Sequence, residues 1–265
     1  MTVYFIGAGP GDPELITLKA MRRIQNCGMV LYAGSLVPDE VLDDAAQGAE
    51  VINTATLSQE PIIEYIQRAE REGMDVARVH SGDPSVYGAI GEQIRRLNEL
   101  GIAYEIIPGV TAASAAAADL GCEFTLPDIS QTLIMTRFAG KTSMPEGESL
   151  GDLAQHGATL AIHLGVTRIH QIVDELRPHY GGDCPVAVLS RVSWPDADKV
   201  TGTLDTITEA VRAKGFNRTA IIIVGHVLDM EGFTDSFLYR QDKAHYYRPK
   251  GRTGAERGRA RLPRA

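Results

Sequence analysis

The chain has 265 residues, of which 44% are hydrophobic and 23% are charged, and its formal net charge is -8. These are ordinary globular values, and the length accommodates one large or two small domains. No apolar run approaches the roughly 20 residues that cross a bilayer, and the chain does not start with a secretory signal pattern. The three cysteines match no metal-ligand spacing, so neither a metal site nor a disulfide framework is expected. We expect a cytoplasmic protein that has no membrane partner.

Charge is unevenly distributed along the chain. From Asp242 to the end, eight Lys/Arg oppose two acids, so this segment carries +6 and residues 1–241 carry -14. A body this acidic is a poor general binder of nucleic acid, so a nucleic-acid partner is not expected. Residues 246–265 are rich in Gly, Arg and Pro and have no apolar periodicity. They are expected to form a basic, disordered tail.

Strand and helix patterns alternate through the first half of the chain. The predicted strands are 3–6, 29–32, 75–79 and 103–107, and the helices between them are 15–27, 61–72 and 89–100. This alternation predicts a mostly parallel sheet with helices on both faces. The pattern pauses at 121–128, so we expect an N-terminal α/β domain over 1–120 and a C-terminal one over 121–245.

The second half has less regular alternation, which predicts a mixed sheet. Its strands are expected at 132–136, 159–163, 185–190, 199–203 and 220–224, and its helices at 150–155, 167–176 and 205–213. The polar segment 135–148 is too long for a tight turn and is expected to be a mobile loop over a cleft. The expected fold class is therefore α/β, with two α/β domains.

The loop after the first strand reads Gly7-Ala8-Gly9-Pro10-Gly11-Asp12 and is close to a nucleotide-binding pattern. Asp12 stands where a dinucleotide fingerprint has its third glycine, and its carboxylate would repel a pyrophosphate. No Lys-Ser/Thr pair follows the glycines, which excludes a P-loop. The loop is instead suited to close backbone approach by a bulky ligand that is not a phosphate chain. Asp12 is either a ligand contact or an N-cap for a helix that begins at Glu14.

Two further small-residue loops follow predicted strands, at 79–88 and 107–118. The carboxyl ends of parallel strands are where open α/β folds bind ligands. Asp83 is suited to accept from ribose hydroxyls or an ammonium group, although a simple Gly-Asp-Pro turn is an equal alternative. Thr111 and Ala112 begin a helix whose first N–H groups are free for a ligand. The alanines after them also fit tight packing of that helix on a sheet.

Three segments, GAGPGDPELIT, SGDPSVYG and IPGVTAASAAAA, resemble in this order the tetrapyrrole methylase family, whose members depend on S-adenosylmethionine. LAIHLGVTRIHQIV, PVAVLSRVSWPD and RTAIIIVGHV resemble later segments of that family, so the resemblance spans about residues 2–245. It implies a two-domain homodimer with an active-site cleft between the domains, which holds the methyl donor, and a tetrapyrrole as substrate. Within the family, the stretches AGSLVP, TATLS and VSWPD resemble members that methylate C-11 of precorrin-4, so the resemblance implies this step of cobalamin biosynthesis.

The resemblance also implies which residues form the site. The expected contacts of the methyl donor are Pro10, Ser81, Gly82, Asp83, Val86, Thr111, Ala112, Leu164, Val192, Thr219 and Ala220. The macrocycle bears many carboxylates, so cationic or hydrogen-bonding groups are expected around it, although each has surface or packing roles as its alternative. The candidates are Arg137, His163, Arg191 and His226, and Gly9, Gly11 and Asp12 of the first loop are expected to face the macrocycle.

No catalytic base is assigned. Relatives that act on uroporphyrinogen carry an acid after the second strand and a basic residue near the end of the third, whereas residues 32–35 and 53–56 here contain neither. This departure favours another ring carbon as the target. A cobalt-bearing substrate, another ring position, an RNA methyltransferase of the same fold and a non-catalytic tetrapyrrole-binding protein stay open as alternatives.

Overall fold

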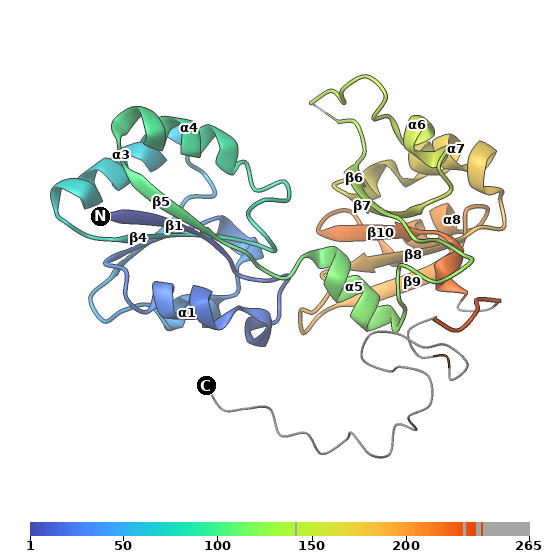
Figure 1. Cartoon of the computed structure of the whole chain (residues 1–265), viewed down its shortest axis with the longest axis horizontal. Helices are drawn as coiled ribbons and strands as arrows, with labels where there is room; N and C mark the ends of the chain where they lie inside the picture. Colours follow the sequence, from blue (N-terminus) through green and yellow to red (C-terminus); the bar gives the residue numbers. More distant parts are fainter. Residues whose placement is uncertain (141, 230–231, 237–239, 241–265) are drawn as a thin grey trace, which may run out of the picture.

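The computed structural model describes residues 1–140, 142–229, 232–236 and 240. It contains two five-stranded sheets, each covered by helices, in two lobes that lie side by side (Figure 1). Within the described residues no helix has the length and apolar character needed to span a membrane. The tail expected over 246–265 lies outside the described residues.

The first sheet is entirely parallel and has the order β3-β2-β4-β1-β5. Its strands are β1 (Thr2–Gly7), β2 (Met29–Tyr32), β3 (Glu50–Asn53), β4 (Val76–His80) and β5 (Ala103–Ile107). Its helices are α1 (Leu18–Ile24), α2 (Asp39–Asp43), α3 (Gln59–Arg71) and α4 (Ile90–Leu100), with single 3₁₀ turns at Pro13–Leu15 and Gly34–Leu36. The expected parallel sheet is confirmed, but β3 and α2 are additions to the predicted elements. Both are short, and β3 is mostly exposed, so neither leaves a strong apolar pattern.

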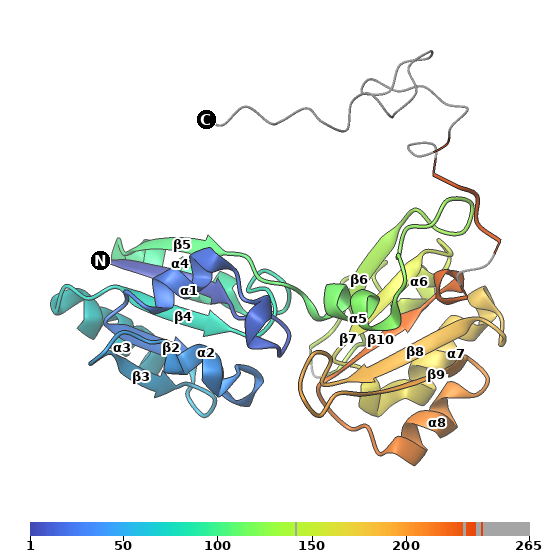
Figure 2. The ribbon, with the colours of Figure 1, turned by 90° about the horizontal axis from the view of Figure 1, so that it is seen from below.

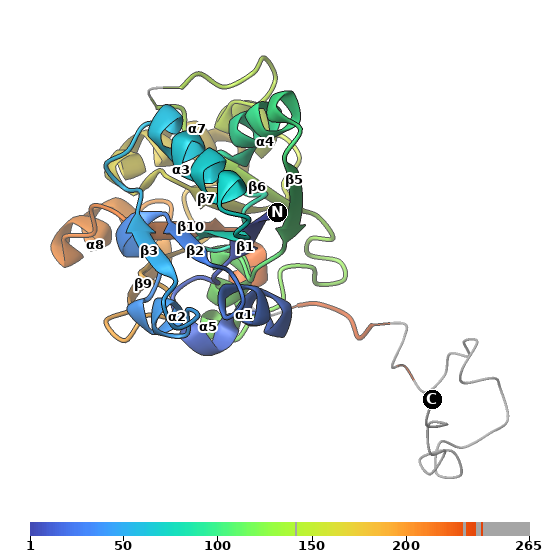
Figure 3. The same cartoon turned by 90° about the vertical axis from the view of Figure 1, so that its left-hand side faces the viewer.

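Alternation along β1 divides the first core between the two faces of the sheet. Val3 and Phe5 pack with α3 and α4, whereas Tyr4 and Ile6 pack with α1 and α2. Successive strand side chains point to opposite faces, so a strand buried on both sides is continuously apolar. Figure 3 shows α3 and α4 on one face and α1 and α2 on the other.

The second sheet is mixed, as expected, and has the order β6-β7-β10-β8-β9. β6 and β7 are parallel, while β10 runs antiparallel to both β7 and β8. The strands are β6 (Leu133–Arg137), β7 (Thr159–His163), β8 (Pro185–Ser190), β9 (Asp198–Thr203) and β10 (Ala220–Val224). The helices are α5 (Ala112–Leu120), α6 (Leu150–Ala154), α7 (Ile169–Tyr180) and α8 (Ile207–Lys214), with 3₁₀ turns at Val166–Arg168 and His226–Leu228.

Helix α5 packs on the second sheet, not on the first. Its buried alanines, including Ala113 and Ala116, share a core with Ala161 and Ile221, and Figure 2 shows α5 in the lobe of the second sheet. The pause in the pattern after residue 120 marks the end of this helix, where Gly121 is a left-handed C-cap with φ 64°. A domain boundary after residue 120 would assign α5 to the first domain, although the helix packs against the second sheet. We propose that the boundary lies in 108–111.

Candidate functional site

Three glycine-containing loops meet at the carboxyl edge of the first sheet. A Cβ added to Gly7 would lie 2.6 Å from the Cα of Gly109, and one added to Gly109 would lie 2.1 Å from the carbonyl oxygen of Gly82. The Gly82 N–H donates to the Gly9 carbonyl at 2.6 Å, and Gly9 N–H donates back to Gly82 at 3.3 Å. Side chains at these positions would separate the loops, so the glycines allow them to form one platform.

Polar side chains brace this platform from behind. Asp83 accepts from the Ser85 N–H at 2.7 Å with Oδ1 and from the Gly109 N–H at 2.9 Å with Oδ2. Thr111 is the N-cap of α5 and accepts from the Ser114 N–H at 3.2 Å. Asp83 and Thr111 therefore hold the second and third loops in position.

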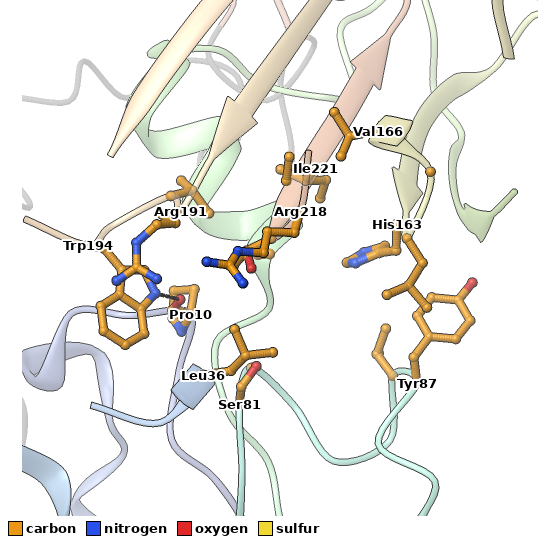
Figure 4. A pocket seen from close by; sticks show the side chains of 18 of the residues that line it. Pro10, Leu36, Ser81, Tyr87, His163, Val166, Arg191, Trp194, Arg218 and Ile221 are labelled. Atoms are coloured by element: carbon orange, nitrogen blue, oxygen red, sulfur yellow. Dashed lines mark hydrogen bonds between the residues drawn. The ribbon is translucent and has the colours of Figure 1, made fainter. Parts of the chain in front are cut away.

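A cavity of about 480 Å³ lies between this platform and the edge of the second sheet. Figure 4 shows its lining, with Pro10, Leu36 and Ser81 on one side and His163, Val166 and Ile221 on the other. Of the residues predicted to contact the methyl donor, only Asp83 and Thr111 do not line this cavity. Those that line it are Pro10, Ser81, Gly82, Val86, Ala112, Leu164, Val192, Thr219 and Ala220.

Backbone strain is concentrated around the cavity. Tyr87, Leu164, Arg191 and Thr219 line it and have positive φ values of 57°, 56°, 50° and 51°. Such conformations cost about 1–3 kcal/mol each and persist where the surrounding structure enforces them, often at ligand sites. Here the Arg191 N–H donates to the Thr219 carbonyl at 2.8 Å, which fixes two of these residues together. The side chain of Leu164 is 73% exposed, so an apolar surface is left open to a ligand.

Two histidines, His80, which is buried, and His163, which is partly buried, face the cavity in neutral form. Burial, aided by the positive charge of Arg78, lowers the pKa of His80 to about 3, and burial also lowers the pKa of His163. The Nε2 atoms of both are buried without a hydrogen-bond partner among the described residues. The His163 ring lies 5.4 Å from the ring of Tyr87. Both imidazoles can therefore offer a hydrogen bond to a ligand without adding charge.

Cationic side chains supply the charge of the cavity. Arg191 and Arg218 line it, and Figure 4 shows the Arg218 guanidinium directed into the space between the domains. No carboxylate belongs to the lining among the described residues. The cavity thus suits a ligand that brings carboxylates of its own.

Trp194 joins the two domains at the side of the cavity. Its indole Nε1 donates to the Pro10 carbonyl at 2.8 Å, and the guanidinium carbon of Arg191 lies 4.2 Å from the centre of its ring. A Cβ at Gly11 would lie 2.2 Å from Cδ1 of the indole, so the absence of a side chain there makes room for the ring. Trp194 is not among the site residues predicted from the sequence, although it is the single tryptophan of the chain and lies in the VSWPD segment.

A second cavity of about 560 Å³ adjoins the first and shares Arg191 and Trp194 with it. Gly11 also lines it, together with Tyr32 and Asn53, which end β2 and β3. The structure thus brings Gly11, Arg191 and His163, three of the predicted macrocycle contacts, to adjoining cavities.

The other predicted macrocycle contacts have different surroundings. Gly9 forms the bridge to the second loop, and Asp12 caps the Pro13–Leu15 turn by accepting from the Glu14 N–H at 2.8 Å. The structure thus shows the capping bond of Asp12, and a contact of Asp12 with the ligand stays a prediction.

Arg137 and His226 are not in either cavity. Arg137 ends β6 but donates to the carbonyls of Thr142 at 3.1 Å and Ser143 at 2.8 Å, so its guanidinium holds its own loop. His226 follows the carboxyl end of β10, whereas Ala220, which lines the first cavity, is at the amino end. Because β10 runs antiparallel to β7 and β8, its carboxyl end lies at the far edge of the sheet.

Comparison with known proteins agrees with this geometry. A family model described as Tetrapyrrole (Corrin/Porphyrin) Methylases matches residues 2–208. A precorrin-4 C(11)-methyltransferase from Pseudomonas aeruginosa is 65% identical over 249 residues, which cover 94% of this chain and 99% of that relative.

Two solved structures are similar in fold and sequence. A cobalt precorrin-4 methyltransferase superimposes with a TM-score of 0.84 at 42% identity, covering 86% of this chain and 96% of the other. A uroporphyrin-III C-methyltransferase from Thermus thermophilus, solved with S-adenosylhomocysteine, has a TM-score of 0.72 at 31% identity and covers 87% of this chain and 100% of the other. The chain belongs to the tetrapyrrole (corrin/porphyrin) methylase family.

Proposed function

We propose that this chain transfers the methyl group of S-adenosylmethionine to C-11 of precorrin-4, giving precorrin-5 in cobalamin biosynthesis. The observation that carries the proposal is the interdomain cavity, whose walls hold nearly all the residues expected to contact the donor. The relative that is 65% identical is a precorrin-4 C(11)-methyltransferase, which supports the ring position.

The residues of the first cavity fit the methyl donor. Its volume, about 480 Å³, is typical of small-molecule sites. At Gly82, φ is +64° and an added Cβ would meet only the Val110 carbonyl oxygen, at 4.0 Å, so the backbone is open to close approach. The exposed side chain of Leu164 offers an apolar surface to an adenine ring. The similar uroporphyrin-III C-methyltransferase holds S-adenosylhomocysteine, the product of the donor.

The contribution of the chain to catalysis is alignment. The sulfonium of S-adenosylmethionine supplies an already activated methyl group. The two domains confine the reactants between rigid walls, and the Trp194–Pro10 bond fixes one wall relative to the other. Orientation of this kind contributes up to about 7–11 kcal/mol to lowering a barrier. A lining free of carboxylates also avoids stabilising the cationic reactant over a transition state in which that charge disperses.

We propose that the macrocycle lies in the second cavity, beside Trp194 and Arg191. Arg191 is partly exposed and its Nε donates to Asp196 at 2.7 Å, which sets the direction of its guanidinium. This leaves its terminal N–H groups for an acidic arm of the ring. The loops after β2 and β3 have no acidic or basic residue at 32–35 and 53–56. The acids that line this cavity are Asp39, Glu40 and Asp196, and none is assigned as a catalytic base.

The decisive experiment is methyl transfer in vitro. Precorrin-4 is incubated with the purified chain and donor labelled at the methyl group, and the labelled carbon is located by NMR. The expected result is a single new methyl at C-11. A methyl at another carbon, or none, would contradict the proposal.

Cobalt-precorrin-4 is the second candidate substrate, because one of the similar solved structures is a cobalt precorrin-4 methyltransferase. The same incubation with the cobalt complex distinguishes the two substrates. A larger kcat/KM for metal-free precorrin-4 supports a place in the oxygen-dependent route of cobalamin biosynthesis, in which the substrate carries no cobalt at this step. Binding of S-adenosylhomocysteine, measured by calorimetry, separates an enzyme from a non-catalytic tetrapyrrole-binding protein. Labelling of RNA under these conditions would support the alternative that the chain is an RNA methyltransferase. The net negative charge of residues 1–241 disfavours this alternative.

We also propose that the chain is a cytoplasmic homodimer. β5 is an edge strand on which Tyr104 and Ile106 are exposed, an apolar strip suited to contact with a second copy. Cys27 and Cys184 are buried free thiols, as is usual in a reducing compartment. Sedimentation equilibrium tests the dimer, and replacement of Tyr104 and Ile106 by Lys is expected to shift it to monomer.

A further inference from the structure

A third cavity, of about 260 Å³, lies where α3 and α4 begin, at the carboxyl edge of the first sheet. Arg78, His80 and Gln93 line it, with Thr54 and Ala55 from the loop after β3. It shares Ala33, His80 and Gly88 with the donor cavity, so the two spaces adjoin.

Arg78 is a buried charge that forms no ion pair with any residue that the structure describes. Its side chain is 5% exposed, Nε donates to Gln93 Oε1 at 3.1 Å, and Nη1 donates to the Leu31 carbonyl at 3.2 Å. Burial lowers its pKa to about 10, which still leaves it charged at neutral pH, and no carboxylate offsets that effect. A buried unpaired charge is costly, so its presence beside a cavity indicates that an anion completes it.

His80 adds a second unsatisfied group to this cavity. Its side chain is 4% exposed, and its Nε2 has no hydrogen-bond partner among the described residues. Burial and the charge of Arg78 keep the imidazole neutral. A carboxylate here would accept from Arg78 and from the ring if Nε2 carries the proton.

Two helix N-termini also face this cavity. α3 has 13 residues and begins after Ser58, and α4 has 11 residues and begins after Ala89. At neither helix does the side chain of the N-cap residue accept a hydrogen bond from the first turn. Gln59 Nε2 donates to the Glu92 carbonyl at 3.2 Å and fastens the two first turns together. Free N–H groups and the positive ends of two helix dipoles favour an anion. The one acid of the described lining, Glu92, is exposed to solvent.

We propose that this cavity is a carboxylate subsite that takes an acidic side arm of the macrocycle, with Arg78 as its counter-charge. The inference rests on the proposed function. A carboxylate is also present at the amino-acid end of the methyl donor. Thr54 and Ala55 of this lining directly follow Asn53, which lines the second cavity, and this favours the macrocycle as the source.

The test compares Arg78→Met with Arg22→Met, which removes the same charge from the exposed face of α1. Uroporphyrin III, a stable macrocycle with acidic arms, is titrated while the fluorescence of Trp194 is followed, and S-adenosylhomocysteine is titrated by calorimetry. Arg78→Met is expected to weaken uroporphyrin binding at least about tenfold and leave S-adenosylhomocysteine affinity within about twofold. Arg78→Lys should restore part of the loss, and Arg22→Met should change neither affinity.

Unchanged uroporphyrin affinity in Arg78→Met would overturn the subsite. Loss of S-adenosylhomocysteine affinity alone would overturn the macrocycle assignment and give the carboxylate to the donor. If Arg78→Met fails to fold, Ala55→Asp against Ala55→Asn provides the same test at an exposed lining position: the added charge should weaken uroporphyrin binding and the isosteric amide should not, and equal effects would overturn the proposal. A wild-type chain that binds uroporphyrin through Arg78 but transfers no methyl would refute the proposed function and retain the subsite.

Discussion

Gly11 has no side chain in a place where a methyl group would collide with the indole of Trp194. The pair shows how a single residue sets the distance between two domains, because the same indole donates to the carbonyl of Pro10. The Asp12 N–H adds a second link, to the hydroxyl of Ser193 at 3.0 Å. The contact between the domains on this side thus depends on a short run of neighbouring residues.

Gly11→Ala is expected to displace Trp194, break its bond to Pro10 and lower kcat/KM for methyl transfer by about tenfold or more, because small displacements at a positioned site are costly. The emission of Trp194, the single tryptophan, reports the displacement as a shift to longer wavelength. Gly91→Ala is the matched control: it lies in α4, where an added Cβ meets nothing within 4 Å, and should stabilise the helix slightly. An unchanged spectrum and rate in Gly11→Ala would show that the indole does not fix the site.

His80 predicts a dependence of stability on pH. Its pKa in the folded chain is lowered to about 3, so below its ordinary pKa of about 6.5 the unfolded chain binds a proton that the folded chain does not. As the pH is lowered below about 6.5, the free energy of unfolding therefore decreases, by up to about 1.4 kcal/mol per pH unit. In urea unfolding, wild type should lose about 1 kcal/mol more than His80→Gln between about pH 7 and about pH 5.5. Parallel losses would show that His80 is protonated in the folded chain.

At the scale of elements, the site is built from strand ends. The parallel sheet places the loops after β1, β4 and β5 at one edge, where the bridge between Gly9 and Gly82 joins two of them. Asp83 joins the second loop to the third through Gly109. The helix that begins the second domain, α5, then starts directly from this platform.

Asp83→Asn is expected to weaken S-adenosylhomocysteine binding although the carboxylate does not line the cavity. The amide offers one oxygen where two N–H groups need acceptors, so the structure loses one charge-assisted hydrogen bond, worth about 1–3 kcal/mol. Calorimetry should show weaker binding, and thermal unfolding a lower Tm. Asp174→Asn makes the same change in charge on an exposed position of α7 and should alter neither value. Full affinity in Asp83→Asn would show that the loops hold their places without this brace.

At the scale of the whole molecule, two separate cores are joined around a cavity. Each sheet has its own apolar clusters on its two faces, and in the described part of the chain no core cluster includes residues from both sheets. The donor cavity takes lining from both domains, so a ligand there contacts both at once. Ligand binding is therefore expected to stabilise the joined state of the two domains.

S-adenosylhomocysteine at 100 times its Kd should stabilise the chain by about 2.7 kcal/mol and raise Tm by about 5–10 °C. Gly82→Ala should abolish this rise, because its methyl group would project into the donor cavity. Gly48→Ala is the matched control, since φ there is +83° and an added Cβ meets nothing within 4 Å, so it carries similar backbone strain away from the site. A ligand-induced rise that survives Gly82→Ala would place the ligand elsewhere.

The sequence by itself determined the elements that have strong apolar periodicity and the parallel and mixed character of the two sheets. It also identified most of the residues that line the donor cavity. These follow from local pattern: strands buried on both faces are continuously apolar, and glycines at strand ends mark close backbone approach. Family motifs then placed residues such as Pro10, Ser81 and Ala220 at one site, and the structure brings them to one cavity.

Only the tertiary structure decided what depends on direction and on partners distant in sequence. The antiparallel course of β10 puts His226 at the far edge of the sheet, and the packing of its alanines assigns α5 to the second domain. Trp194 acquires its role only because Gly11, 183 residues away in the sequence, leaves room for it. In the sequence Arg78 looks like an ordinary strand residue. Only the structure shows that it is buried and that no opposite charge among the described residues lies beside it. Such features are set by which surfaces meet, and no local pattern carries that information.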